Sequence, residues 1–504
     1  MIATQHVVAA VPPMPTSRLA RWLPLRRLWP LLVVAAAFIG PASNPIGLAD
    51  IWWTLQSGAW MVEHGTLLVA DPFTSAPPTS GPVYNMQWLA QLIYFGFFHL
   101  GGLELVIAAT AAAIALTYGL VLAASVVASG RLRLACLSVA LAYLLAFSNL
   151  SPRPQTLAYP IFGFVLLAVM RAEWRHDTRA LWCLPALTVV WANVHGSFFA
   201  GWLLLGCAAT GRALTERSLR AAGPYLLALL GCCLASLVTP FGPGSIAYLA
   251  GMGSNPIVRD LVTEWAPTSV GFREGVFFFL SLAGMLVLAL RARVRLTLTE
   301  LLLLAVFGWL AISSVRAIVW WGLVLAPIAT RLLGSLAARQ TPRPAAAAEK
   351  PLLNLVILCS ILGMVVASLP WLKAEMPVLP EDKRSLVSAA DTPVRVSEYL
   401  RTSPLPPGRV FTHLAWGGYL DWAVWPAARP FLDGRIEIHP PQVWIDYLTI
   451  TFPGAEWRSL LDRYAIGTVV LDRGAEADLA RALAADPGWQ KTYEDDQAVV
   501  FVRA

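Results

Sequence analysis

Apolar residues occur in long runs along the first three quarters of the chain, and short segments containing Arg, Pro and Gly separate the runs. A membrane-spanning helix needs roughly 20 mostly apolar residues, and several runs approach that length. The pattern therefore predicts a polytopic, all-α membrane domain over residues 28–371. The runs lie near residues 28–42, 86–128, 134–149, 155–170, 181–194, 196–211, 222–238, 276–290, 299–313, 316–330 and 352–370.

The positions of Arg and Lys predict the topology. If the N-terminus is cytoplasmic and 86–128 crosses once, the cytoplasmic segments hold nineteen Arg and Lys residues and the outer segments hold four. Basic residues favour the cytoplasmic side, so this arrangement, with about eleven crossings, is the predicted one. It makes residues 1–27 a cytoplasmic lead and 45–85 and 239–275 outer loops. The first run is interpreted as a signal anchor, and a cleavable signal peptide is the alternative.

Two segments near the predicted outer face are expected to differ from ordinary membrane-spanning helices. Residues 50–63 predict an amphipathic helix with three tryptophans, which suits a helix lying at headgroup level. Residues 86–100 are expected to enter from the interface before the chain continues inward, or to form a re-entrant piece. Both segments belong to the outer side in the predicted topology.

Beyond Pro370 the chain becomes polar, and residues 381–504 hold 17 of the 30 acidic residues. We expect a linker over 372–392 and an extracytoplasmic soluble domain over 393–504. Apolar alternation predicts a small α/β or α+β fold for this domain. The expected elements are strands at 409–412, 467–471 and 498–502 and a helix at 475–485.

Composition narrows the class of protein. The chain has 57% hydrophobic and 13% charged residues, against about 25% charged residues in average soluble proteins, which excludes an ordinary soluble fold and a disordered chain. Its net charge of +7 does not indicate nucleic-acid binding. The Arg residues stand in short clusters between apolar runs, where they are expected to contact membrane lipids.

Candidate chemistry gathers at the outer ends of the predicted helices. Ionisable groups are costly within a membrane and are functional candidates by default. Asp50 is the candidate catalytic residue, and Arg259 and Asp260 lie in the same outer region. The candidate substrate-binding residues are Asp71, Arg153, Asn193, His195, Glu264, Trp265 and Arg316.

This set of residues suits a transferase whose donor carries a lipid phosphate. Such a donor leaves its phosphate at headgroup depth while its tail stays in the bilayer, and Arg binds phosphate through two parallel hydrogen bonds. A nearby carboxylate can deprotonate an acceptor hydroxyl or bind a divalent metal ion. No cofactor is assigned with certainty, and the divalent metal stays an open alternative.

Each candidate also has a structural interpretation. Asp50 can cap the helix that follows it, and Asp71 can begin a turn. Arg153 and Arg316 can extend their side chains to the interface, and His195 can be a hydrogen-bonded packing residue. Glu264 can cap a surface helix, and the Asp433-Gly434-Arg435 segment of the tail is interpreted as a turn.

Several motifs resemble bacterial GT-C glycosyltransferase-like membrane proteins. They comprise Asp50-Ile-Trp-Trp-Thr-Leu-Gln-Ser-Gly58, Asp71-Pro-Phe-Thr74, Gln87-Trp-Leu89, Ser151-Pro-Arg-Pro154, Trp191 to Gly196, Glu264-Trp265, Gly417-Gly418 and Asp433-Gly-Arg435. The likeness covers most of the chain and extends to protein O-mannosyltransferases and aminoarabinose transferases. The paired acidic motif of many members is absent, because Ala49 and Ile51 flank Asp50.

The resemblance implies a multi-pass protein of the cell inner membrane that moves a sugar from a polyprenyl-phosphate donor to a glycan, lipid or protein acceptor. Asp50 matches the acidic residue that serves these proteins as base or metal ligand. The alternative is a membrane protein without catalytic activity, either a transporter of lipid-linked glycans or a scaffold for envelope assembly.

Overall fold

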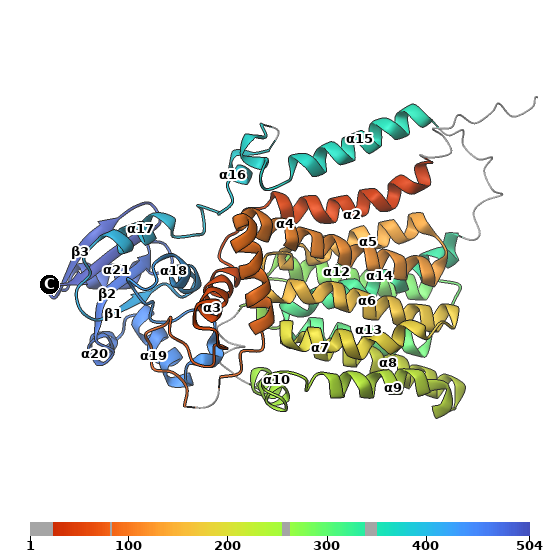
Figure 1. Cartoon of the computed structure of the whole chain (residues 1–504), viewed down its shortest axis with the longest axis horizontal. Coiled ribbons are helices and arrows are strands. Elements are labelled where there is room, and N and C mark those ends of the chain that lie inside the picture. The colour runs from red at the N-terminus through yellow and green to blue at the C-terminus, as the bar shows by residue number, and fades with distance from the viewer. Residues whose placement is uncertain (1–23, 81–82, 255–262, 338–349, 378) are drawn as a thin grey trace, which may run out of the picture.

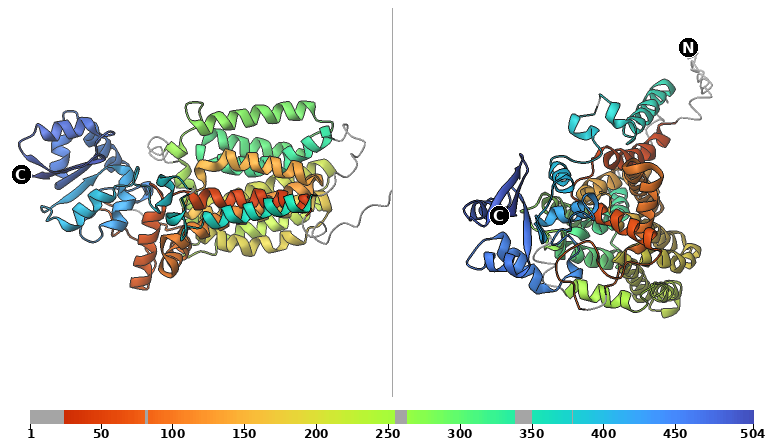
Figure 2. Two further views of the ribbon diagram at one scale, coloured as in Figure 1. Left: turned by 90° about the horizontal axis from the view of Figure 1, so that it is seen from above. Right: turned by 60° about the vertical axis from the view of Figure 1, so that its left-hand side comes forward.

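The computed structural model describes residues 24–504 except for 81–82, 255–262, 338–349 and 378. Most of the predicted N-terminal lead, together with Arg259 and Asp260, therefore lies outside the described residues. The described part consists of a bundle of long helices and a smaller mixed domain that lies beyond one end of the bundle (Figures 1 and 2).

The bundle confirms the predicted helical membrane domain. Within the described residues, seven helices are long and apolar enough to cross a membrane and four more are apolar but shorter, so the chain is a multi-pass membrane protein. The eleven helices are α2 (Leu25–Ser43), α4 (Trp88–Ser129), α5 (Leu132–Ala146), α6 (Pro154–Arg175), α7 (Leu184–Val194), α8 (Phe199–Glu216), α9 (Leu219–Ala235), α12 (Arg273–Arg291), α13 (Leu298–Ser313), α14 (Ile318–Ala337) and α15 (Pro351–Ala367).

Glycines let the bundle helices approach one another closely. A Cβ at Gly211 would lie 2.3 Å from Oγ1 of Thr299, which joins α8 to α13. A Cβ at Gly322 would lie 3.2 Å from the carbonyl oxygen of Ala142, which joins α14 to α5. Small residues at such crossings are typical of membrane bundles, where tight packing replaces the hydrophobic effect between helices.

Helix α4 is kinked rather than straight. Its 42 residues would span roughly 63 Å at 1.5 Å per residue, about twice the hydrocarbon thickness. Gly101 and Gly102 leave helical geometry, and Gly102 has a φ of 66°, which glycine adopts without strain. The part before the kink lies across the end of the bundle and the part after it runs with the other helices (Figure 1).

Helix α3 (Ile51–His64) matches the predicted amphipathic helix, but its tryptophans have a different environment from the expected one. Trp52 and Trp53 are buried and contact the soluble domain, with Trp52 packed edge-on against Tyr419 at 5.0 Å. The other face meets α4, where Gly58 lies against the backbone of Gln91. The helix is thus enclosed between the bundle and the soluble domain (Figure 1).

The second of the two predicted outer loops contains, in its described residues, the helix α10 (Gly244–Ser254) and the 3-10 helix η4 (Thr263–Trp265). Backbone hydrogen bonds attach the end of this loop to the bundle. Thr268 donates its N–H to the carbonyl of Ile312 at 2.9 Å, and Val315 donates to Ala266 at 3.2 Å. These bonds hold η4 beside η5 (Val315–Ala317), the 3-10 turn that precedes α14.

The predicted linker region is folded against the bundle. It contains η6 (Lys373–Glu375) and α16 (Glu381–Arg384). After α16, the chain pairs with the segment that follows α2, because Ile46 donates its N–H to Leu386 and accepts one from Ser388, both at 2.8 Å. The linker therefore joins both parts of the molecule.

The soluble domain has a four-stranded mixed sheet in the order β1-β2-β4-β3. Strand β1 pairs with β2 in parallel, and the other pairs are antiparallel. This arrangement confirms the predicted small α/β domain, with β3 as an addition. The strands are β1 (Arg409–Thr412), β2 (Ile466–Asp472), β3 (Trp489–Glu494) and β4 (Ala498–Arg503); the helices are α17 (Val394–Thr402), η7 (Leu414–Trp416), α18 (Gly417–Ala423), η8 (Ile436–Ile438), α19 (Pro441–Thr451), α20 (Trp457–Arg463) and α21 (Ala477–Ala484).

Candidate functional site

Four of the candidate residues meet at the end of the bundle that faces the soluble domain. Arg153 is the residue before α6, His195 lies between α7 and η3 (Gly196–Phe198), Arg316 lies in η5, and Glu264 lies in η4. We call these four residues the outer-end cluster. The sequence separates them by up to 163 positions, and the ends of three bundle helices and one loop bring them together.

In this cluster, two guanidinium groups converge on one carboxylate. Nη1 of Arg153 donates to both carboxylate oxygens of Glu264, at 2.9 and 2.8 Å. Nη1 of Arg316 lies 3.8 Å from one of the same oxygens. Burial by itself would raise the pKa of Glu264, but the two guanidiniums outweigh burial and lower this pKa. The two guanidiniums thus converge on a position that the Glu264 carboxylate occupies, and the charges of these three residues sum to one positive charge.

The imidazole of His195 adds a donor to the same place. Nδ1 accepts a hydrogen bond from the backbone N–H of Ser197 at 3.0 Å, so the ring proton of neutral His195 lies on Nε2. Burial and the charges of Arg316 and Arg153 lower the pKa of His195, which keeps the ring neutral. Nε2 lies 3.5 Å from Nη2 of Arg316. Both groups are donors, so neither satisfies the other.

Residues that the sequence analysis left out hold the arginines in place. Nε of Arg316 donates to the Gln155 side chain at 2.7 Å, and Nε of Arg153 donates to Ser151 at 3.1 Å. The ring of Trp265 lies 5.6 Å from the Arg316 guanidinium and packs against the core of the soluble domain. These contacts hold the two guanidinium groups in place before a ligand binds. Little side-chain entropy is therefore lost on binding.

Asp50 lies close to the outer-end cluster and does not cap α3 with its side chain. Its backbone carbonyl accepts from the N–H and hydroxyl of Thr54, at 3.1 and 2.6 Å, and the carboxylate makes no capping bond. The Asp50 charge helps to raise the pKa of Arg153, which burial alone would lower. It acts on Glu437 of the soluble domain as well. The Asp50 charge therefore acts on both the bundle and the soluble domain.

Asp71 belongs to a second group, the seam cluster, which consists of Asp71, Asp421, Asp433 and Arg435. Arg435 is buried and its Nη2 lies 2.8 Å from Asp71, 2.5 Å from Asp433 and 3.6 Å from Asp421. Asp71 also accepts the N–H of Thr74 at 2.8 Å, so it forms a turn and an ion pair at once. The cluster joins the first outer loop to the soluble domain.

One cation in the seam cluster faces three carboxylates, and the pKa values of two of them shift in opposite directions. Burial and the Asp433 carboxylate raise the pKa of Asp421 well above its ordinary range. Burial would also raise the pKa of Asp433, but Arg435 outweighs it and the pKa falls. Asp421 is therefore the group of this pair that takes up a proton first.

Glycines explain why the turn that carries Asp433 lies where it does. A Cβ at Gly417 would lie 2.2 Å from the carbonyl oxygen of Leu432, and a Cβ at Gly418 would lie 3.2 Å from the ring of Trp53. A side chain at Gly417 would clash with the turn, and a side chain at Gly418 would press on Trp53 of α3. The two glycines and the Asp-Gly-Arg segment, which are far from α3 in sequence, thus form one contact with it.

Asn193 lies outside both clusters. Its amide donates to the carbonyls of Val189 and Val238, both at 2.8 Å, and accepts from Nε1 of Trp88 at 2.9 Å. These bonds connect the ends of α7, α9 and α4. The amide therefore has a positioning role in the described structure, and its predicted contact with substrate stays a prediction.

In the part of the chain that the structure describes, no group of three or more His, Cys, Asp and Glu side chains is placed to hold a metal ion. At the outer-end cluster the positive charge comes from Arg153 and Arg316.

The comparisons add a structural likeness without a sequence match. No family model matches the chain, and no curated protein matches it in sequence. Among solved structures, the Archaeoglobus fulgidus oligosaccharyltransferase tethered with an acceptor peptide is 13% identical, with a TM-score of 0.53 over 96% of this chain and 75% of that chain. ArnT from Cupriavidus metallidurans is 15% identical, with a TM-score of 0.53 over 96% of this chain and 98% of that chain.

The chain has the GT-C fold. The likeness extends over the bundle and the soluble domain, since nearly the whole chain is covered in both comparisons. At these low identities the likeness shows the fold alone. A further structure with this fold, the oligosaccharyltransferase AglB from A. fulgidus, contains an inhibitory peptide and a dolichol-phosphate.

Proposed function

We propose that the chain is a GT-C glycosyltransferase that transfers a sugar from a polyprenyl-phosphate donor to an acceptor hydroxyl at the extracytoplasmic face of the inner membrane. The observation that carries the proposal is the convergence of Arg153 and Arg316 on one carboxylate at the end of the bundle, with Nε2 of His195 3.5 Å from the Arg316 guanidinium. The polyprenyl tail would lie beside the bundle in the bilayer.

The charges of the outer-end cluster suit a phosphodiester. Arg153 and Arg316 bring two positive charges, and Glu264 compensates one of them. A sugar linked to a polyprenyl phosphate carries one negative charge on its phosphate, which the two guanidiniums would bind. His195 would donate from Nε2 as a neutral group, which adds a hydrogen bond without another charge.

Asp50 would act as the base. The acceptor oxygen forms a bond to the anomeric carbon of the sugar, and the bond between that carbon and the phosphate oxygen breaks. The acceptor proton passes to the Asp50 carboxylate, and the polyprenyl phosphate leaves with one additional negative charge. Arg153 and Arg316 would stabilise that charge as it develops, which is where preorganised donors contribute most to the rate. Asp71 would act indirectly, through Arg435.

The charge pattern supports the proposed orientation. The Arg-rich ends of the bundle helices, with Arg131, Arg175 and Arg291 among them, lie at the opposite end from the outer-end cluster. A cytoplasmic location for these ends satisfies the positive-inside rule and places the soluble domain outside. AglB with the GT-C fold binds dolichol-phosphate, which is the class of lipid that the proposal requires.

The proposal is tested by Asp50→Asn in a strain that lacks the chromosomal gene. Envelope glycans and lipid-linked sugars are analysed by mass spectrometry after complementation. We expect Asp50→Asn to lose the transferred sugar and to accumulate the lipid-linked donor, with normal amounts of the protein, because the amide cannot take up the acceptor proton.

Asp478→Asn is the matched control, since Asp478 lies on the exposed surface of α21. This variant should behave as the wild type. Wild-type product levels in the Asp50→Asn strain would contradict the proposal and favour a non-catalytic role such as glycan transport.

A further inference from the structure

A cleft of about 660 Å³ lies between the first outer loop and the soluble domain. Its walls are residues 74–78 of the loop, residues 405–410 leading into β1, and residues 426–429 after α18. No residue of the outer-end cluster lines it. Small-molecule sites in proteins usually enclose roughly 300–1,000 Å³, so the cleft has room for a small organic ligand.

The walls of the cleft are ordered by proline rings and by hydrogen bonds between the loop and the soluble domain. Ser75 donates its N–H to the carbonyl of Pro430 at 2.9 Å, and Nδ1 of His439 donates to the carbonyl of Pro77, also at 2.9 Å. Because the walls are ordered in advance, little conformational entropy is lost when a ligand binds. The five lining prolines, whose rings fix the backbone, are Pro77, Pro78, Pro406, Pro407 and Pro426.

Two guanidinium groups bring positive charge to the cleft. Arg409 of β1 is half-buried, and Arg429 is exposed with its guanidinium 5.9 Å from the ring centre of Trp425. Neither arginine forms an ion pair with another described residue. Arg409 donates to the carbonyl of Tyr464 at 3.3 Å, and Arg429 donates to the carbonyl of Thr74. A guanidinium has five N–H groups, so each arginine keeps donors for a ligand.

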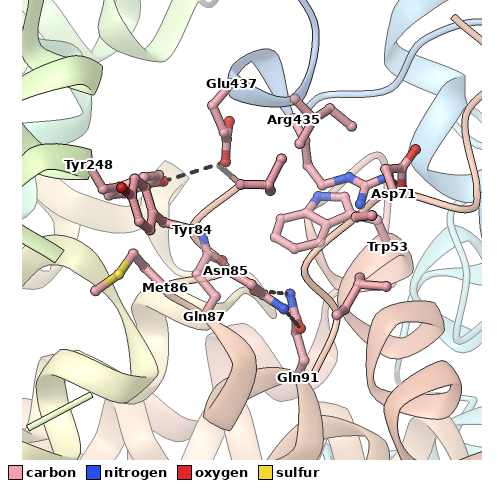
Figure 3. A pocket seen from close by; sticks show the side chains of 14 residues that line it. Trp53, Asp71, Tyr84, Asn85, Met86, Gln87, Gln91, Tyr248, Arg435 and Glu437 are labelled. Atoms are coloured by element: carbon pink, nitrogen blue, oxygen red, sulfur yellow. Dashed lines mark hydrogen bonds and ion pairs between the residues drawn. The ribbon is translucent and has the colours of Figure 1, made fainter. Parts of the chain in front are cut away.

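Asp71 does not balance this charge. It is the one acidic side chain among the described residues that line the cleft. Its carboxylate is already bound by Arg435 at 2.8 Å, beside which it lies in Figure 3, and by the N–H of Thr74 at 2.8 Å. The seam cluster, to which Asp71 belongs, carries one negative charge when Asp421 is protonated, against two positive charges in the cleft. The cleft therefore favours an anion.

We infer that this cleft is a second ligand site, separate from the proposed transfer centre, and that it binds a small organic anion through the guanidiniums of Arg409 and Arg429. The acidic group of the ligand is a carboxylate or a phosphate, because both accept two parallel hydrogen bonds from a guanidinium. The proline rings contact its carbon skeleton. The bound anion touches the first outer loop and the soluble domain at once, so it strengthens their contact. The inference goes beyond the proposed function and does not depend on it.

The test measures binding to the full-length protein in nanodiscs of phosphatidylcholine, a lipid without net charge. Glucuronate presents a carboxylate, glucose 1-phosphate presents a phosphate, and glucose is the neutral comparison. Isothermal titration calorimetry at low ionic strength should show saturable binding of at least one of the two anions and no binding of glucose. The same anion should raise the melting temperature, because a ligand that binds only the folded state stabilises it. Binding of neither anion, or equally tight binding of glucose, would overturn the inference.

Variants then place the bound anion. Arg409→Gln and Arg429→Gln should each raise its Kd about tenfold, since each removes a charge-assisted hydrogen bond. Arg401→Gln is the matched control, because it makes the same chemical change on the exposed surface of α17, and it should bind as the wild type does. Arg409→Gln carries the test if Arg429→Gln, which loses its contact with Thr74, does not fold.

Arg316→Gln separates the cleft from the outer-end cluster, where two guanidiniums also converge. This variant should keep the affinity of the wild type. Loss of binding in Arg316→Gln but not in Arg409→Gln would place the anion at the outer-end cluster and refute the cleft, while leaving the proposed transferase intact. Equal Kd values for Arg409→Gln, Arg429→Gln and Arg401→Gln would refute it as well.

Discussion

The outer-end cluster and the seam cluster both combine arginine with carboxylates, but cations outnumber carboxylates in the first and carboxylates outnumber cations in the second. In the outer-end cluster two cations share Glu264, whose side chain is 34% exposed. In the seam cluster one cation, Arg435, faces three buried carboxylates. A surplus of donors at a partly open position suits an anionic ligand, and a buried, crowded set suits a permanent joint. Charge balance and burial thus separate a binding position from a structural one.

The largest effect should come from Arg435→Met. Removal of this cation leaves three buried carboxylates without compensation, and breaking a buried ion pair costs about 3–5 kcal/mol. We expect a lower melting temperature and a low yield of purified protein. Arg401→Met, which removes an exposed ion pair on α17, should change the stability by less than about 1 kcal/mol. Equal stability of the two variants would mean that the seam cluster is not a joint.

A smaller effect, on activity rather than stability, is expected for Arg316→Lys. Lysine keeps the charge but loses the planar fork that can bind Gln155 and a phosphate at the same time. Loss of one charge-assisted hydrogen bond corresponds to a transfer rate about 10- to 100-fold lower. The rate is measured in nanodiscs with the lipid extract as donor, and the melting temperature should stay near that of the wild type. Unfolding of this variant would place Arg316 among the structural residues.

The smallest expected effect is a gain in stability from Asp421→Asn. The raised pKa of Asp421 means that the folded state binds its proton more tightly than the unfolded state, whose pKa is near 3.9. The stabilising contribution is present below that value and is lost as pH rises toward the raised pKa. The asparagine variant avoids this loss, so it should be more stable than the wild type at neutral pH and should show a flatter pH dependence.

Asp433→Asn, at the other carboxylate of this pair, should change the stability in the opposite direction. The pKa of Asp433 is lowered, so its contribution to stability is present above about pH 3.9 and is lost as pH falls further. At neutral pH this variant should be less stable than the wild type. Thermal unfolding between pH 4 and pH 8 compares the two variants, and equal changes would contradict the assignment of the proton to Asp421.

The sequence predicts the bundle and the outer-end cluster well, because both follow from local patterns. Apolar runs fix the helices, and Arg153, His195 and Arg316 come directly at helix ends, which the predicted topology places on one side. The seam cluster is different. The fold of the soluble domain brings Arg435 to Asp71, and no periodicity records such a long-range contact.

The interpretation of Asp433-Gly434-Arg435 as a turn describes only the backbone of this segment. The backbone N–H of Arg435 does bond to Asp433 at 2.8 Å, as a turn requires. The same side chains form the centre of the seam cluster, which local sequence cannot reveal. The burial of Trp52 and Trp53 against the soluble domain could not be predicted for a related reason, since their partners follow more than 350 positions later in the chain.

The enclosure of α3 also has a consequence for synthesis of the protein in the cell. Helix α3 is synthesised more than 350 residues before Tyr419 and Trp422, which cover Trp52. Until those residues are made, the aromatic face of α3 has no cover from the soluble domain, and exposed apolar surface of this kind favours aggregation or binding by chaperones. The soluble domain therefore completes the protection of a segment that is made long before it.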